Sequence, residues 1–186
     1  MIKKECVNYV AFDLETTGLC AEFDEIIEIG AIKVKDGKVV DKFNVLIKPK
    51  NKISKKITSI NGINNEMVEN CQSIEEVLPK FIEFTEKLPL VAHNVDFDYG
   101  FINENYKRIY GKQFRRKKIC TLKLMKKYLK KEELKDIYIG GYKLLDLVYE
   151  FLDLEEWRKY HSINHRALVD AEMVYKIYDN QLWLYV

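Results

Sequence analysis

Acidic side chains stand at two closely spaced positions near the start of the 186-residue chain. Asp13 and Glu15 lie in residues 9–15, an apolar run that ends at the turn-forming residues Thr16-Thr17-Gly18 and is typical of a β-strand. Because side chains alternate along a strand, both carboxylates project from one face. Two such neighbours raise each other's pKa unless a cation lies between them, and a divalent cation with oxygen ligands is the usual solution. Two solvated acids at the end of an edge strand are the alternative.

Two further acids fall on the inward faces of expected helices. Apolar residues recur at helical spacing in 96–110, and Asp98 lies three and four positions before Phe101 and Ile102. An ordinary acid in a first helical turn is the alternative for Asp98. Asp170 falls inside the apolar stripe of the final helix, which consists of Ala167, Ala171, Val174 and Tyr178. A buried, unpaired charge is so costly that such an acid neutralises, pairs or binds a metal.

One histidine lies close to the last of these acids. His165 precedes Asp170 by five residues, which would place it about 140° away around an ideal helix. We therefore expect His165 at the entrance of the helix, over the same site. Its imidazole has a pKa near neutral pH and suits general-base chemistry. A helix cap or a surface group is the alternative.

Three strings of residues resemble the three exonuclease motifs of the DEDDh, or DnaQ-like, 3′-to-5′ exonucleases. They are Phe12-Asp13-Leu14-Glu15-Thr16-Thr17-Gly18-Leu19, His93-Asn94-Val95-Asp96-Phe97-Asp98 and His165-Arg166-Ala167-Leu168-Val169-Asp170-Ala171. The strings occur in the family's order and spacing, and the similarity runs from Tyr9 to near Gln181. It implies an α/β, RNase H-like fold with a five-stranded mixed central sheet flanked by helices. The nearest relatives it implies are the epsilon proofreading subunit of bacterial DNA polymerase III and its polymerase-fused counterparts.

The resemblance also implies a chemistry. The chain would hydrolyse phosphodiester bonds from the 3′ end of single-stranded or frayed DNA and release nucleoside 5′-monophosphates. Asp13, Glu15, Asp98 and Asp170 would hold two divalent cations, Mg²⁺ or Mn²⁺, and His165 would take a proton from the attacking water. Two cations would neutralise the negative charge that builds up on the phosphodiester oxygens, and Mg²⁺ suits a site built of carboxylates.

Five further residues are implied to contact the substrate: Thr16, Ile60, Asn61, His93 and Asn94. Thr16 would lie against the 3′-hydroxyl of the terminal nucleotide, and a turn residue is the alternative for it. Asn61 stands where the family commonly has histidine, and it can form hydrogen bonds but cannot carry charge. This departure leaves the choice between DNA and RNA open. Ile60 is either an apolar wedge or a core residue, and Asn94 is either a motif residue or the cap of the helix that follows.

The remaining pattern predicts one exonuclease domain over residues 1–186, in which 47% hydrophobic residues suffice for a core. Apolar runs at 26–34 and 39–47 flank Asp36-Gly37, a strong hairpin signal. Ser73 and Glu76 form a capping-box pattern that opens a helix. We expect short strands at 88–92 and 118–121, helices at 122–129 and 143–151, and a flexible loop at 130–142 that contains Gly140-Gly141. A strand meander followed by alternating helices and strands favours a mixed α/β fold.

The charge is nearly balanced, since 31 basic and 29 acidic residues leave +2, so only local clusters can indicate a nucleic-acid partner. Two basic runs either neutralise phosphates or form a solvated surface. They consist of Lys48, Lys50, Lys52, Lys55 and Lys56, and of Lys107, Arg108, Lys112, Arg115, Arg116, Lys117 and Lys118. Tyr106, Tyr110 and Phe114 lie among the second run and would either stack on bases or, for the two tyrosines, pack within a helix.

Location and assembly are less constrained by sequence. No apolar run approaches the roughly 18 residues of a membrane span, and nothing resembles a signal peptide. Cys6, Cys20, Cys71 and Cys120 lack paired spacing, which favours a reducing cytoplasm.

Little follows the last helix beyond residues 182–186, whereas separate proofreading subunits often carry a tail for polymerase attachment. A free-standing nuclease or an excised domain is therefore expected at least as much as a polymerase partner. An RNA-trimming exoribonuclease and a catalytically idle nucleic-acid-binding module are the alternative functions.

Overall fold

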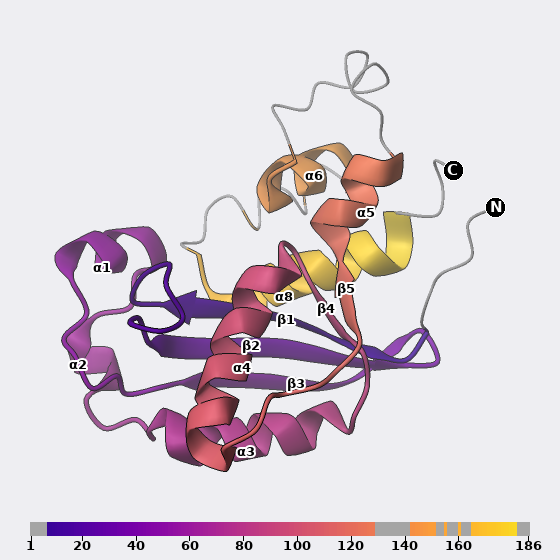
Figure 1. Ribbon diagram of the computed structural model, residues 1–186. Helices are drawn as coiled ribbons and strands as arrows, with labels where there is room; N and C mark the ends of the chain where they lie inside the picture. The colour runs from indigo at the N-terminus through magenta and orange to yellow at the C-terminus, as the bar shows by residue number, and fades with distance from the viewer. Residues whose placement is uncertain (1–6, 129–141, 152–154, 156–159, 161–164, 182–186) are drawn as a thin grey trace.

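The computed structural model describes residues 7–128, 142–151, 155, 160 and 165–181. Figure 1 shows a central sheet with helices on both faces. Its spatial order is β3-β2-β1-β4-β5, and the strands are β1 (Tyr9–Thr16), β2 (Ile26–Lys35), β3 (Lys38–Leu46), β4 (Leu90–Ala92) and β5 (Lys118–Cys120). The first three strands form an antiparallel meander, and β4 and β5 run parallel to β1. The predicted five-stranded mixed sheet is confirmed.

Two layers of helices enclose this sheet. The helices in the described part of the chain are α1 (Lys55–Asn61), α2 (Asn65–Val68), α3 (Ile74–Thr85), α4 (Val95–Tyr110), α5 (Thr121–Tyr128), α6 (Leu144–Phe151) and α8 (Ala167–Lys176), which continues into the π-helical segment η2 (Ile177–Gln181). One apolar core joins the sheet to α6 and α8, and another joins it to α3 and α4. The predicted helices at 96–110, 122–129 and 143–151 are confirmed within a few residues.

Strand β1 lies in the middle of the sheet and contributes to both cores. Tyr9 is fully buried on the α8 side, and Phe12 is fully buried on the α3 side. Burial of one such side chain contributes roughly 1.5–3 kcal/mol to folding. Because Asp13 and Glu15 share the face of Tyr9, the α8 side of the strand changes from apolar to acidic near its end. The edge-strand alternative for this pair is therefore wrong.

Local signals in the sequence set several boundaries. Asp36 (φ 51°) and Gly37 (φ 72°) adopt left-handed conformations between β2 and β3, which confirms the hairpin. Ser73 and Glu76 form the predicted capping box of α3. The short helices α1 and α2 were not among the predicted elements, although Ser54 and Asn64 cap them through side-chain hydrogen bonds.

The aromatic residues in the last turns of α4 and just after it contact one another. The Tyr106 ring centroid lies 4.5 Å from that of Tyr110 and 5.2 Å from that of Phe114, which confirms the packing interpretation for Tyr106, whereas Tyr110 is 42% exposed. Cys20, Cys71 and Cys120 are free thiols. Among the described residues, none of the helices combines the length and apolarity that membrane crossing requires. The predicted loop at 130–142, except Tyr142, lies outside the described residues, as do Cys6 and residues 182–186.

Helix α8 approaches the sheet closely at one glycine. A Cβ atom on Gly30 would overlap the backbone of Ala167 and Leu168, so any larger residue would push the helix away from β2. Gly30 is the cross-strand partner of Asp13. The close approach therefore brings the first turn of α8, with Asp170, to the acidic end of β1.

Candidate active site

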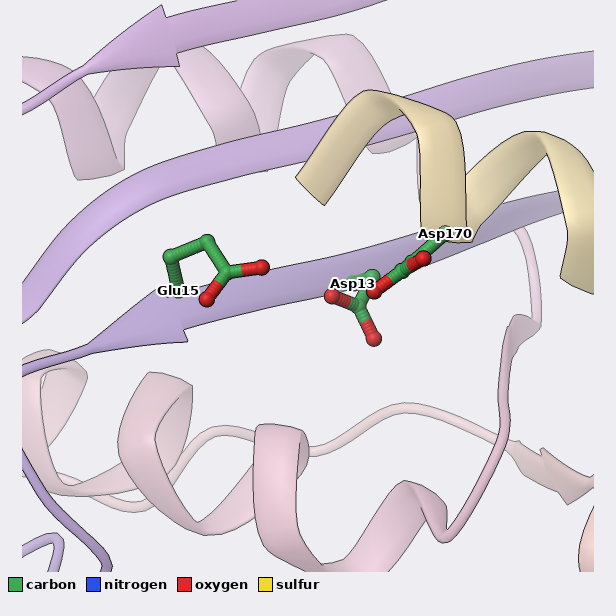
Figure 2. A group of neighbouring side chains, drawn as sticks. All are labelled: Asp13, Glu15 and Asp170. Atoms are coloured by element: carbon green, nitrogen blue, oxygen red, sulfur yellow. The ribbon is translucent and has the colours of Figure 1, made fainter. Parts of the chain in front are cut away.

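Three of the four predicted acids converge at the end of β1. One carboxylate oxygen from each of Asp13, Glu15 and Asp170 lies within 4.8 Å of the other two. Figure 2 shows the carboxylates of Asp13 and Asp170 pointing toward each other, with Glu15 farther along the same strand. Glu15 and Asp170 are only 8% and 7% exposed. Residues from opposite ends of the chain thus form one cluster of oxygen donors.

Asp98 approaches the cluster from the other side of the sheet. It lies in the first turn of α4 and is 2% exposed, so the prediction that it faces inward is confirmed. Burial raises the pKa of Asp98 to about 8, hydrogen bonds with the backbone of Asp98 and Leu14 oppose this shift, and the charges of Glu15 and Asp170 add to it. Asp98 is not one of the three acids whose oxygens lie mutually within 4.8 Å among the described residues.

The cluster is strongly self-repulsive. Burial is the largest cause that raises the pKa of Asp13 well above 3.8, followed by the charges of Asp98, Asp170 and Glu15. Burial likewise raises the pKa of Glu15 to about 7, although a hydrogen bond from Asn61 opposes it. A cation between these oxygens would remove the repulsion. The donor set is compact, electron-rich and composed of oxygen atoms. It therefore fits hard divalent cations.

His165 lies next to this cluster, as expected. Its Nδ1 lies 3.0 Å from Oδ2 of Asp170, and the hydrogen bond raises the pKa of His165, while partial burial opposes the shift. The imidazole is 63% exposed. The capping alternative is wrong, because Arg166 occupies the N-cap position of α8. Because an ionised carboxylate only accepts hydrogen bonds, Nδ1 donates this bond, and in the neutral imidazole Nε2 is then the proton acceptor.

The predicted substrate residues at the end of β1 and on α1 border one cavity. This cavity of about 520 Å³ is lined by the acids Asp13, Glu15 and Asp170, by His165, and by Thr16, Lys56, Ile60 and Asn61. Ile60 is 48% exposed, so its interpretation as a core residue is wrong. Thr16 donates its hydroxyl hydrogen bond to the carbonyl of Gly18 over 2.6 Å.

Asn61 faces the acids instead of the solvent. It is 2% exposed, its Nδ2 donates to Oε2 of Glu15 over 3.1 Å, and its Oδ1 accepts from the backbone N–H of Ile63 over 3.0 Å. The residue that departs from the family pattern therefore orients Glu15.

His93 and Asn94 lie at the start of α4. The ring nitrogens of His93 contact Oγ1 of Thr121 at 3.0 Å and the carbonyl of Tyr142 at 2.8 Å, and burial lowers its pKa. His93 borders a second cavity, of about 820 Å³, which shares His165 and Asp170 with the first. Asn94 occupies the N-cap position of α4, as the capping interpretation expects, but it is left-handed (φ 63°) and forms no side-chain capping bond. Its backbone carbonyl accepts from the N–H of Phe97 over 2.9 Å.

Two site residues were missed by sequence reasoning. Glu28 on β2 is 1% exposed and binds the guanidinium of Arg166 through both carboxylate oxygens. The available signals were a charged residue between Ile27 and Ile29 in an apolar strand, and an arginine directly after the motif histidine. Neither signal indicates which residue the side chain pairs with, because Glu28 and Arg166 are 138 residues apart in the sequence.

The order of the strands, the helices on both faces of the sheet and the position of the acids at the end of the central strand define an RNase H-like fold. Two solved structures share this fold. Escherichia coli exonuclease I in complex with a dT13 oligonucleotide aligns with 92% of this chain and 40% of its own, with a TM-score of 0.73 and 16% identity. Exonuclease X in complex with 5′-overhanging duplex DNA aligns with 95% and 94%, with a TM-score of 0.58 and 24% identity.

The chain belongs to the exonuclease family designated RNase T, whose sequence model matches residues 10–178. The PolC-type DNA polymerase III of Thermotoga petrophila is 44% identical over 174 residues, which are 94% of this chain and 12% of that polymerase. The DNA polymerase III subunit epsilon of Aquifex aeolicus is 42% identical over 133 residues, 70% of this chain and 66% of that subunit. The resemblance to the DnaQ-like exonucleases is thereby confirmed. The chain spans 12% of the length of the PolC-type relative.

Proposed function

We propose that residues 1–186 form a metal-dependent 3′-to-5′ exonuclease domain that acts on single-stranded or frayed DNA ends and releases nucleoside 5′-monophosphates. The observation that carries the proposal is the convergence of Asp13, Glu15 and Asp170 beside His165. Family membership supports exonuclease chemistry. The identity with PolC-type polymerases and an epsilon subunit supports DNA as the substrate and a proofreading or repair role with a polymerase as partner.

The acids of the site are proposed to hold two divalent cations, Mg²⁺ or Mn²⁺. Asp13, Glu15 and Asp170 supply oxygen donors close enough to share an ion, and Asp98 completes the acidic set. When bound, the cations neutralise the negative charge that develops on the phosphodiester oxygens. Asn61 fixes Glu15 through its amide, so this carboxylate is held in place before a cation arrives.

His165 is proposed as the general base. Asp170 accepts the hydrogen bond of Nδ1–H and holds the ring over the cluster, which leaves Nε2 to take the proton of the attacking water. General-base catalysis of this kind contributes about 10²- to 10⁴-fold in rate.

The cavity beside the acids is proposed to receive the terminal nucleotide. Exposed Ile60 offers an apolar surface to a base, Thr16 lies at the end of β1 beside the acids, and Lys56 provides a positive charge for a backbone phosphate. Lys56 and Ile60 are four residues apart on α1 and therefore share a face of the helix. His93 and Asn94 complete the proposed set from the start of α4.

Degradation of end-labelled oligonucleotides tests the proposal. With Mg²⁺ or Mn²⁺, wild-type protein should shorten 5′-labelled single-stranded DNA stepwise, whereas Asp13→Asn should not. Asp96→Asn is the matched control, since Asp96 belongs to a motif string but pairs with Lys118 and Lys123 at the surface. Equal degradation by wild type and Asp13→Asn, or none by wild type, would refute the function. A strong preference for RNA over DNA of the same sequence would reassign the substrate.

A further inference from the structure

A buried acid on β2 lies beside the cluster yet has a partner of its own. Glu28 is the cross-strand neighbour of Glu15, so the two carboxylates share one face of the sheet. At 1% exposure, an unpaired Glu28 would add a further negative charge to a region that already repels itself. Within the part of the chain that the structure describes, its carboxylate instead accepts hydrogen bonds from the start of α8.

The contacts between Glu28 and α8 fix the orientation of the start of the helix as well as its distance from β2. Nε of Arg166 donates to Oε1 and Oε2 of Glu28 over 3.1 and 2.9 Å, and Nη2 donates to Oε1 over 2.6 Å. The backbone N–H of Ala167 donates to Oε2 over 3.0 Å. A forked guanidinium–carboxylate pair is geometrically specific, and the Ala167 N–H is one of the donors that a helix leaves unsatisfied at its start. Glu28 therefore caps α8 from the neighbouring strand.

The Glu28–Arg166 pair lies at the first turn of α8, which carries Asp170 of the candidate active site. Arg166 directly follows His165, and the backbone N–H of Asp170 donates to the carbonyl of Arg166 over 3.0 Å. Two residues farther along β2, Gly30 admits the backbone of Ala167. The strand thus holds the first turn of α8 at two points, one ionic and one steric.

On the basis of the proposed function, we propose that Glu28 and Arg166 are positioning residues of the exonuclease site. The pair holds the first turn of α8 where His165 and Asp170 meet the acids of β1. Neither residue needs to touch the substrate for this role. Partners of this kind that orient metal-binding or catalytic groups typically change metal affinity or activity 10- to 100-fold when they are lost.

The same strand offers a matched control for a merely stabilising ion pair. Lys33 is 7% exposed on β2 and lies 2.9 Å from Oε1 of Glu86. Five residues separate it from Glu28, or about 16 Å along the strand. Glu86→Gln therefore weakens a partly buried ion pair between β2 and the end of α3 without reaching the acids.

The experiment compares Glu28→Gln, Arg166→Lys and Glu86→Gln with the wild type. It measures kcat and KM on a single-stranded oligonucleotide with Mg²⁺, Mn²⁺ affinity by calorimetry, and the free energy of unfolding in urea. Glu28→Gln keeps the size of the side chain, and Arg166→Lys keeps the charge but loses the fork. We expect kcat to fall about 10- to 100-fold with KM changed less than about 3-fold, and Mn²⁺ binding to weaken about 10-fold. Glu86→Gln should lower only the stability.

Three outcomes would overturn the positioning role: wild-type kcat and Mn²⁺ affinity in both site variants, a loss of kcat no larger than the unfolded fraction explains, or an equal loss in Glu86→Gln. If Glu28→Gln fails to fold, Arg166→Lys still decides the matter, because it keeps a positive partner for Glu28. A wild type without nuclease activity would refute the proposed function, and the Mn²⁺ measurements would then test the positioning role alone.

Discussion

Glu15→Gln should make the metal-free protein more stable at neutral and basic pH. Burial raises the pKa of Glu15 from its ordinary 4.5 to about 7, so in the folded state this carboxylate resists ionisation. A raised folded-state pKa contributes stability that is fully present below pH 4.5 and is lost as the pH rises through about 7. Glutamine has nearly the same volume, and its side-chain carbonyl can still accept the hydrogen bond that Asn61 donates to Glu15.

The size of this effect follows from the shift in pKa. Each tenfold change in proton affinity corresponds to about 1.4 kcal/mol, so the penalty for ionised Glu15 reaches about 3 kcal/mol above pH 7. It nearly vanishes at pH 4.5. Loss of the Glu15 charge also reduces the repulsion felt by Asp98, which acts in the same direction. The stability advantage of the variant over the wild type should therefore increase by about 2–3 kcal/mol from pH 5 to pH 8.

Urea unfolding followed by circular dichroism measures the difference, on protein freed of metal with a chelator and held at pH 5 or pH 8. Glu86→Gln provides a control of opposite sign, because hydrogen bonds from Lys35 and Lys33 lower the pKa of Glu86. That control should lose stability at pH 8 and approach the wild type as the pH falls through the lowered pKa of Glu86, below 4.5. A Glu15→Gln variant no more stable than the wild type at pH 8, or equally stabilised at both pH values, would refute the reasoning. Saturating Mn²⁺ should reverse the order at pH 8, since only the wild type keeps the full donor set.

Three further changes test other parts of the site. His165→Ala should lower kcat about 10²- to 10⁴-fold while Mn²⁺ binding measured by calorimetry persists; full activity across neutral pH would remove the general-base role. Lys56→Ala should raise KM and reduce the salt slope of single-strand binding by about 0.7, whereas Lys55→Ala, on the same helix but outside the cavity, should not; equal slopes would contradict a phosphate contact. Gly30→Ala should destabilise the fold by about 1–3 kcal/mol or more in thermal unfolding, because a Cβ overlaps α8; wild-type stability would mean that the helix yields freely.

Much of the fold was predictable because its signals are local. Alternation along β1, the Asp36-Gly37 turn and the capping box of α3 each act within a few residues, and all three appear as expected. The inward placement of Asp98 and Asp170 was predictable for the same reason, since helical spacing fixes which face a residue occupies. Their convergence with β1 was inferred from the family resemblance, because spacing within one element says nothing of its neighbours.

Other features depend on contacts that local patterns do not encode. Asn61 and Glu15 are 46 residues apart, and the chain between them includes two whole strands. The exposure of Ile60 depends on how the short α1 is tilted against the end of the sheet, and an apolar residue on such a helix suits a core position equally well. In both cases the type of residue permits several roles, and only the packing around it selects one.

The acids at this end of the sheet show how neighbours divide equivalent carboxylates into different roles. Asp13, Glu15 and Glu28 project from one face of two paired strands, so position alone would assign all three to the same cation site. Glu28 is paired with a forked arginine and caps a helix, whereas the side-chain partner of Glu15 in the described part of the chain is a neutral amide. Asp13 lies among the other carboxylates, and their charges raise its pKa further. Because an acid that is already paired with a cationic side chain gains little from a metal, the partners, more than the strand positions, determine which carboxylates remain for a divalent cation.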